Sequence, residues 1–219
     1  MMIHIKDLTF SYTGSPPYIL NKINLDIKKG AYVSIIGENG SAKTTLIKLI
    51  LGLLHPLKGT IQVQTRKIGY VPQIMETFNS QFPITVSELI KCHMKILKIK
   101  DKASLERCLN IIGMNDFKNS LIGNLSGGQR QKIFIARALI GHPELLILDE
   151  PSTGVDIPSQ REIYKIISNL NKSLSITILS VEHNLEAALE NSSQICTISN
   201  GNACLYSIEE YKKSIGHKN

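Results

Sequence analysis

Hydrophobic and polar residues alternate in two segments near the N-terminus, IHIKDLTFSY at 3–12 and YILNKINLDI at 18–27. This period of two places apolar side chains on one face of a strand, so both segments predict antiparallel strands with one face in water. Three other segments are mostly apolar without alternation, namely AYVSIIG at 31–37, LLILD at 145–149 and SITILSV at 175–181. Such runs predict strands that are buried on both faces of a parallel sheet.

Apolar residues recur at helical spacing in five further segments, which predict amphipathic helices. These segments are 44–54, 86–98, 103–113, 133–141 and 161–170. Helices that alternate with buried strands predict an α/β fold, in which helices cover both faces of a parallel core sheet. Two of the helices follow one another without an intervening strand, and we interpret residues 76–130 as an inserted helical subdomain. The chain is then one domain, 1–219, with an antiparallel β subdomain on its N-terminal side.

Composition narrows the class of protein only slightly. The 219 residues include 42% hydrophobic and 20% charged residues, as in an ordinary globular domain. No apolar run is long enough to cross a membrane, and the start MMIHIKDLTF lacks the apolar stretch of a secretory signal, which indicates a cytosolic location. The net charge of +7 fits an anionic partner, but does not choose between a nucleotide, nucleic acid and an acidic membrane surface.

The four cysteines provide no sign of a metal site or a disulfide framework. Cys92, Cys108, Cys196 and Cys204 lack CxxC spacing, and we expect unpaired, buried thiols. His93 follows Cys92 directly, and adjacent residues on a helix point in different directions, so this pair is a poor candidate for metal binding.

The segment GENGSAKTT at 37–45 lies between a predicted strand and a predicted helix, and approaches the phosphate-binding pattern GxxxxGK[ST]. The glycines allow backbone N–H groups to face phosphate oxygens, Lys43 can reach the terminal phosphates, and the Thr44 hydroxyl can bind Mg²⁺. The residues expected to bind ATP here are Gly37, Asn39, Gly40, Ser41, Ala42, Lys43, Thr44 and Thr45. The alternative is a glycine-rich turn that precedes a core helix.

Two carboxylates follow the apolar strand at 145–149, where the sequence reads LLILDE. The carboxyl edge of a parallel sheet is where ligands of α/β folds bind. We expect Asp149 to hold Mg²⁺ and Glu150 to act as the base that activates the attacking water. Acids after a strand are common, but together with the loop at 37–45 they indicate a nucleotide-hydrolysing site.

The segment LSGGQRQKIFIARAL at 125–139 carries a resemblance that extends over essentially the whole chain. LSGGQ is the signature of ABC transporter ATP-binding subunits, and the chain resembles this family of P-loop NTPases. Ser126 and the two glycines begin a helix, so a hydroxyl and free N–H groups face an anion. In the family, that anion is the γ-phosphate bound to the opposite subunit. The resemblance therefore implies a homodimer in which Ser126, Gly127, Gly128 and Gln129 contact ATP.

Other positions match the family one by one. Tyr12 resembles the aromatic residue that stacks on adenine, although a structural tyrosine at a strand end is the alternative. Gln73 in YVPQ resembles the glutamine that meets Mg²⁺ and the attacking water. Asp156 in STGVD resembles the aspartate that crosses the dimer interface, with Val155 in place of the commoner leucine. His183 resembles the switch histidine that contacts the γ-phosphate.

Ala42 departs from the pattern, which has a glycine at this position. A left-handed backbone there would cost roughly 1–2 kcal/mol with alanine, whereas a helical backbone would cost little. Because Lys43, Thr44 and the two acids are intact, we interpret the loop as active. Some metal-ion importers of the family also have alanine at this position.

The resemblance implies ATP hydrolysis that drives a separate membrane permease, with the chain as a peripheral subunit on the cytoplasmic face of the membrane. The implied catalytic residues are Glu150, His183, Gln73 and Lys43, and the implied Mg²⁺ ligands are Thr44, Gln73 and Asp149. An extracellular solute-binding protein is an indirect partner, and nucleic acid is not expected as one. A chromosome or repair ATPase would need a long coiled coil after Gln73, which is missing. A nucleotide-binding regulator with little turnover stays open because of Ala42.

The segment NSQFPITVSELI at 79–90, together with YVPQ, resembles the zinc and manganese importers of the family. In the family this segment meets the permease, so Phe82, Ile84 and Val86 are expected to reflect which permease is bound. The alternative is that these residues only cap a helix of the subdomain. We expect a divalent metal as the solute, with zinc favoured over manganese; a different solute is the alternative.

Overall fold

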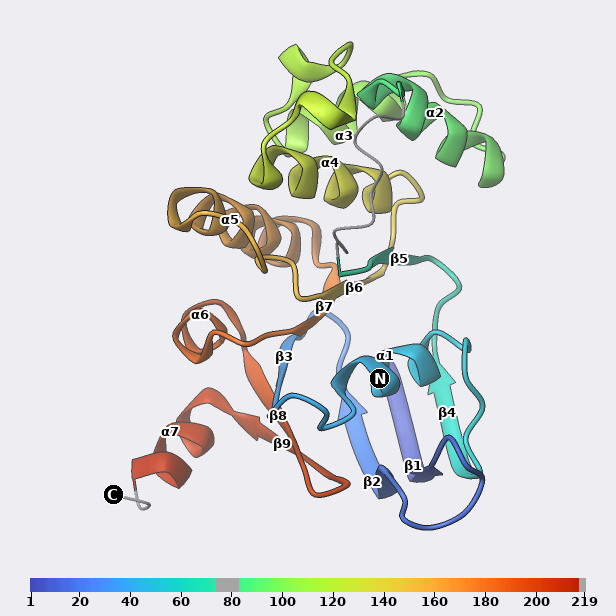
Figure 1. Ribbon diagram of the computed structural model, residues 1–219, viewed down its shortest axis with the longest axis vertical. Helices are drawn as coiled ribbons and strands as arrows, with labels where there is room; N and C mark the ends of the chain where they lie inside the picture. Colours follow the sequence, from blue (N-terminus) through green and yellow to red (C-terminus); the bar gives the residue numbers. More distant parts are fainter. Residues whose placement is uncertain (74–82, 217–219) are drawn as a thin grey trace.

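Two β-sheets organise the chain, as Figure 1 shows for the computed structural model, which describes residues 1–73 and 83–216. The first sheet has the strand order β2-β1-β4 and is antiparallel throughout. Its strands are β1 (Ile3–Phe10), β2 (Leu20–Ile27) and β4 (Lys58–Val63). In β2, buried and exposed residues largely alternate, which confirms the prediction from the period of two.

The second sheet has the order β5-β6-β7-β3-β8-β9, and its first five strands run parallel. The strands are β3 (Tyr32–Ile36), β5 (Ile68–Val71), β6 (Leu145–Asp149), β7 (Thr177–Val181), β8 (Gln194–Ser199) and β9 (Asn202–Ser207). The last strand, β9, pairs antiparallel with β8. The predicted strands at 31–37, 145–149 and 175–181 are confirmed.

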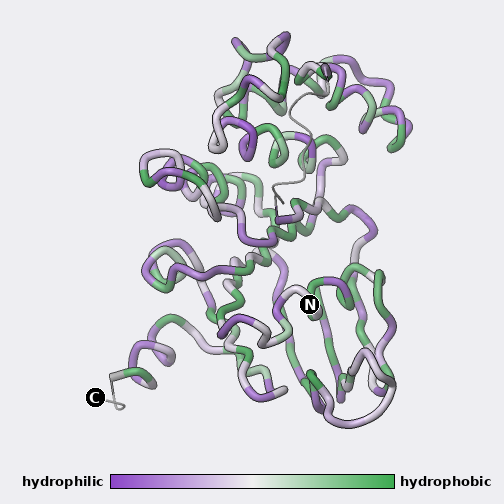
Figure 2. Tube along the Cα trace, in the orientation of Figure 1, coloured by the Kyte–Doolittle hydropathy of each residue, from purple (hydrophilic) through white to green (hydrophobic). Residues whose placement is uncertain are grey.

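The parallel sheet separates two hydrophobic cores. Leu146 and Leu148 of β6 belong to the core on the side of the helical segment, whereas Leu145 and Ile147 belong to the core shared with the N-terminal sheet. Figure 2 shows hydrophobic stretches in the strands at the centre and mixed colouring along the helices. Burial on both faces explains why β6 reads as an unbroken apolar run.

Seven α-helices accompany the strands in the described residues. They are α1 (Lys43–Ile50), α2 (Val86–Ile96), α3 (Ala103–Ile111), α4 (Gly127–Leu139), α5 (Ile157–Leu174), α6 (Leu185–Asn191) and α7 (Ile208–Gly216). Helices α2, α3 and α4 lie together at one end of the molecule, between β5 and β6 in the chain (Figure 1). Of the limits predicted for the helical subdomain, residue 76 lies outside the described residues and residue 130 falls inside α4.

The start of α2 corrects one expectation about the permease. Thr85 caps this helix and forms a capping box with Glu88. Val86 is fully buried, and Ile84 packs against the core of the helical segment. Val86 therefore cannot meet a permease as expected, because it is the first residue of α2 and packs in the core of the helical segment. Phe82 lies outside the described residues.

The cysteine prediction is half wrong. All four thiols are free, and Cys108 and Cys196 are buried, but Cys92 and Cys204 are exposed. Cys92 occupies the solvent face of α2, and Cys204 lies on the edge strand β9, so neither position faces a core. Within residues 1–73 and 83–216, no helix has the length and hydrophobicity that crossing a membrane requires, and no group of three potential metal-binding side chains occurs.

Candidate functional site

The loop 37–42 connects β3 to α1 at the carboxyl end of the parallel strands, and it needs glycine at two positions. A β-carbon on Gly37 would lie 2.4 Å from the carbonyl oxygen of Ile198, which leaves no room for a side chain. Gly40 has a φ of +81°, in the left-handed region that favours glycine. The loop backbone therefore turns tightly, as a phosphate-binding loop before a helix must.

Ala42 caps the N-terminus of α1 with a φ of 76° and a ψ of 21°, so its backbone is left-handed. Of the two conformations considered from the sequence, the structure has the costly one. A β-carbon in this region costs roughly 1–2 kcal/mol relative to the right-handed helix. Alanine is therefore strained at this position.

Ala42→Gly is expected to raise the free energy of unfolding by about 1 kcal/mol. The substitution relieves the strain at φ 76°, and this gain exceeds the larger loss of backbone entropy that glycine brings. ATP affinity should change little, because the backbone conformation is already the one that glycine prefers. Urea unfolding and a nucleotide titration check the two statements. A loss of stability would contradict the left-handed backbone.

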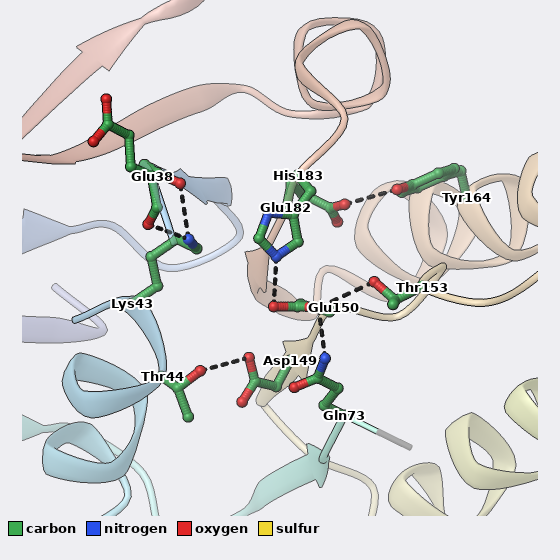
Figure 3. A network of polar contacts seen from close by, with 11 residues as sticks. Glu38, Lys43, Thr44, Gln73, Asp149, Glu150, Thr153, Tyr164, Glu182 and His183 are labelled. Carbon is green, nitrogen blue, oxygen red and sulfur yellow. Dashed lines mark hydrogen bonds and ion pairs between the residues drawn. The ribbon is translucent and has the colours of Figure 1, made fainter. Parts of the chain in front are cut away.

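Lys43 and Ser41 present polar groups in this loop. The Lys43 ammonium is buried, and its Nζ donates to the carbonyl oxygens of Gly37 at 2.8 Å and Glu38 at 2.9 Å (Figure 3). Burial lowers the pKa of Lys43, while the carboxylates of Glu150 and Asp149 act in the opposite direction. The Ser41 hydroxyl is buried and finds no hydrogen-bond partner among the described residues, so it is a donor available to an anion.

Asp149 and Thr44 meet at the edge of the sheet. The Thr44 hydroxyl donates to Asp149 Oδ1 at 3.3 Å, and Asp149 is buried at the end of β6 (Figure 3). Burial raises the pKa of Asp149, and the hydrogen bond from Thr44 lowers it. A hydroxyl oxygen next to a carboxylate is a ligand pair that Mg²⁺ prefers, so these two residues fit that ion.

Glu150 is held by three side chains from different parts of the chain. Gln73 Nε2 donates to its Oε2 at 2.8 Å, and the Thr153 hydroxyl donates to the same oxygen at 3.1 Å. His183 Nε2 lies 2.5 Å from Oε1, as Figure 3 shows. Glu150 itself has a φ of 55°, an uncommon conformation for a residue with a side chain. The structure thus brings Gln73, Glu150 and His183 together, and it adds Thr153, which sequence reasoning missed.

Tyr12 reaches the loop from the N-terminal sheet. Its hydroxyl lies 3.1 Å from Thr45 Oγ1, and its ring, which is 66% exposed, meets Phe10 edge to face. Tyr12, Ala42, Lys43 and Glu150 line one pocket. An exposed aromatic ring at the mouth of this pocket is placed where a base could stack on it.

Ser126 and the other residues of the LSGGQ signature lie at the start of α4. Ser126 caps α4: its Oγ accepts from the backbone N–H of Gln129 at 3.2 Å, and Gln129 Oε1 accepts from the Ser126 N–H at 2.9 Å. A β-carbon on Gly128 would lie 2.5 Å from Ser159 Cβ, so α4 packs closely on the start of α5, which Asp156 caps. No hydrogen bond among the described residues joins Ser126 to the loop 37–45.

Sequence reasoning also missed a buried acid, Glu182, which lies between β7 and His183. It is 2% exposed, and its carboxylate accepts from the Ser180 hydroxyl at 2.5 Å and the Tyr164 hydroxyl at 2.7 Å. Burial raises the pKa of Glu182 to about 7, although these two hydrogen bonds lower it. The signal that could have found it is an acid directly after an apolar strand, the same signal that identified Asp149.

The raised pKa of Glu182 predicts a pH effect on stability. The folded chain binds the proton more tightly than an unfolded glutamate with a pKa of 4.5, so protonation favours the folded state. This contribution is fully present below pH 4.5 and is lost as the pH rises through about 7. Between these values the wild type should lose about 3 kcal/mol of unfolding free energy relative to Glu182→Gln, which does not titrate. Urea unfolding across this range measures it, and parallel curves for the two proteins would contradict it.

Comparison with known proteins gives a matching family model, two similar relatives and a similar solved structure. A family model described as ABC transporter matches residues 20–153. The "Probable metal transport system ATP-binding protein" of Treponema pallidum (strain Nichols) is 45% identical over 94% of this chain and 87% of its own length. The high-affinity zinc uptake system ATP-binding protein ZnuC of Bacillus subtilis (strain 168) is 41% identical over 83% and 84%. The dimeric ATP-binding cassette MJ0796, bound to ADP and Pi after hydrolysis, superposes with a TM-score of 0.77 at 25% identity, over 94% and 99%.

Proposed function

Since this chain belongs to the ABC transporter family, we propose that two copies of it bind and hydrolyse ATP between them to drive the import of a divalent metal ion. The observation that carries the hydrolytic part is the carboxylate of Glu150. It is held by Gln73, Thr153 and His183, it directly follows Asp149, and it lines one pocket together with the loop 37–45. No other described acid combines these neighbours.

The loop 37–42 and helix α1 bind the phosphates. Backbone N–H groups of 37–42 and the N-terminus of α1 face the triphosphate, the Ser41 hydroxyl donates to a phosphate oxygen, and the Lys43 ammonium exchanges its loop carbonyls for the terminal phosphates. The Tyr12 ring stacks on the adenine. Ser126 and the N–H groups after it, from the second copy, complete the γ-phosphate site.

Thr44 and Asp149 would hold Mg²⁺, and Gln73 would contact it from the end of β5. When bound, Mg²⁺ neutralises charge on the phosphates. Glu150 accepts a proton from the attacking water, and Gln73 and Thr153 keep its Oε2 oriented for that purpose. His183, now beside Glu150 Oε1, turns to the γ-phosphate in the closed dimer, which releases the carboxylate for catalysis.

Transport requires partners in addition to this chain. We place it at the cytoplasmic face of the membrane, bound to an integral permease, with an extracellular solute-binding protein as an indirect partner and without nucleic acid. The whole chain acts as one ABC ATPase domain, and helices α2, α3 and α4 belong to its helical subdomain. The names of the relatives in Treponema pallidum and Bacillus subtilis support a metal, and the second supports zinc.

Growth in a metal chelator tests the solute. A strain that lacks this gene should grow poorly in the chelator and recover when Zn²⁺ is added, because the transporter supplies zinc. The strain with the gene restored is the control. Recovery with Mn²⁺ alone would indicate a manganese importer, and indifference to both metals would contradict a metal solute while leaving the ATPase in place.

A further inference from the structure

A chain of hydroxyl groups connects the buried Glu182 with the loop that follows Glu150. The Tyr164 hydroxyl donates to Glu182 Oε2 at 2.7 Å and lies 2.7 Å from Ser152 Oγ. Figure 3 shows Tyr164 reaching from α5 toward Glu182. A tyrosine has one hydroxyl proton, and here the carboxylate accepts it, so Ser152 must donate to the tyrosine oxygen. While Glu182 is ionised, all hydrogen bonds of the chain therefore run from Ser152 toward Glu182.

Each end of this hydroxyl chain is linked to Glu150. At one end, Glu182 directly precedes His183, whose Nε2 is 2.5 Å from Glu150 Oε1. At the other end, Ser152 belongs to the loop 150–156, which leads from Glu150 to the cap of α5. Gln160 of α5 donates to the carbonyl oxygens of Ser152 at 3.2 Å and of Val155 at 2.8 Å, so the same helix holds the loop at several points.

The hydrogen-bond partners of the Glu182 carboxylate are hydroxyl groups. No lysine or arginine of the described residues forms an ion pair with it. The groups that face it are Ser180 of β7, Tyr32 of β3, Tyr164 of α5, and the nearby His183 and Glu150. Its burial brings its pKa to about 7, so the charge of this network changes close to neutral pH.

We propose that Glu182 is a positioning residue for ATP hydrolysis, which holds the loop 150–156, and with it Glu150, through Tyr164 and Ser152. This inference rests on the proposed role of Glu150. A protonated Glu182 donates to the tyrosine oxygen, the tyrosine then donates to Ser152, and Ser152 has to turn its own proton elsewhere. When Glu182 is ionised, the hydrogen bonds run from Ser152 through Tyr164 to Glu182, and this is the more active form.

Phosphate release as a function of pH tests this proposal with three variants. In the wild type, kcat should rise with pH through an inflection close to the pKa of Glu182. Tyr164→Phe should lose that inflection, since the link between Glu182 and Ser152 is gone, and should lower kcat roughly tenfold through misplacement of Glu150. Glu182→Gln should show no inflection, and KM for ATP should stay within about twofold in each variant.

Ser152→Ala separates the hydroxyl chain from the buried charge. It leaves Glu182, Tyr164 and their hydrogen bond in place but disconnects the loop, so the inflection in kcat should disappear. Persistence of the inflection in this variant would overturn the proposal, because Glu182 would then act directly through His183. The control is Tyr206→Phe, which removes a hydroxyl from β9 and should match the wild type.

A second readout does not depend on catalysis. The backbone amide signal of Ser152 in NMR spectra should shift with pH in the wild type, with the same midpoint as the Glu182 carboxyl carbon, and should lose that shift in Glu182→Gln. A Ser152 signal that ignores the titration of Glu182 overturns the proposal. A wild type that releases no phosphate but shows the coupled shift would contradict the proposed ATPase roles and leave the network intact.

Discussion

Glu150→Gln is expected to hydrolyse ATP roughly 10²-fold or more slowly than the wild type and to bind ATP as well. Glutamine keeps the size of the side chain and can still meet Gln73 and Thr153, but it has no oxygen basic enough to take a proton from water. Because ATP is then bound without being consumed, the variant should accumulate as an ATP-bound dimer. Phosphate release and size-exclusion chromatography with ATP measure the two effects.

The matched control is Glu190→Gln, which changes an exposed glutamate on α6 in the same way. Its turnover should equal that of the wild type. If Glu150→Gln releases phosphate at the wild-type rate, the assignment of Glu150 as the base is wrong.

Lys43→Ala is expected to weaken ATP binding roughly 10²-fold, since removal of one partner of a buried charged contact typically costs about 2–5 kcal/mol. The ammonium is buried and held at the loop by the carbonyls of Gly37 and Glu38, so no neighbouring lysine can take its place. A titration with a fluorescent ATP analogue measures the change in Kd.

Lys29→Ala serves as the control for Lys43→Ala, because Lys29 is exposed in the turn before β3. It removes the same charge from the chain and should leave Kd unchanged. Equal affinity of the Lys43 variant and the wild type would mean that the loop 37–45 does not bind the triphosphate.

Local patterns were sufficient to predict the parts of the fold that are buried on one face or on both. The apolar run at 145–149 became β6 because each face of the sheet contacts a separate core. The strands β4, β5, β8 and β9 were not predicted, because they are short or lie near an edge and mix polar with apolar residues. Their place in the sheet depends on pairing with distant strands, which local periodicity does not record.

The residues of the candidate site were likewise predicted only in part. Glu150, Gln73 and His183 were each chosen from a motif, and the structure brings them together. Tyr164 and Glu182 were missed because their contact joins a helix to the end of a strand 18 residues further along the chain. The conformation of Ala42 was undecidable because alanine is compatible with both backbones considered; only the tertiary packing of the loop selects the left-handed one.

The central claim is that each ATP site is built from the loop 37–45 of one copy and Ser126 of the other. Lys43→Ala and Ser126→Arg each damage both sites of a homodimer, so each variant alone should release almost no phosphate. A mixed dimer has one site with an intact loop and an intact signature, and an equimolar mixture should therefore regain a substantial part of the wild-type activity. Single-turnover phosphate release on the mixture measures this directly, and a mixture no more active than its two components would contradict the shared site.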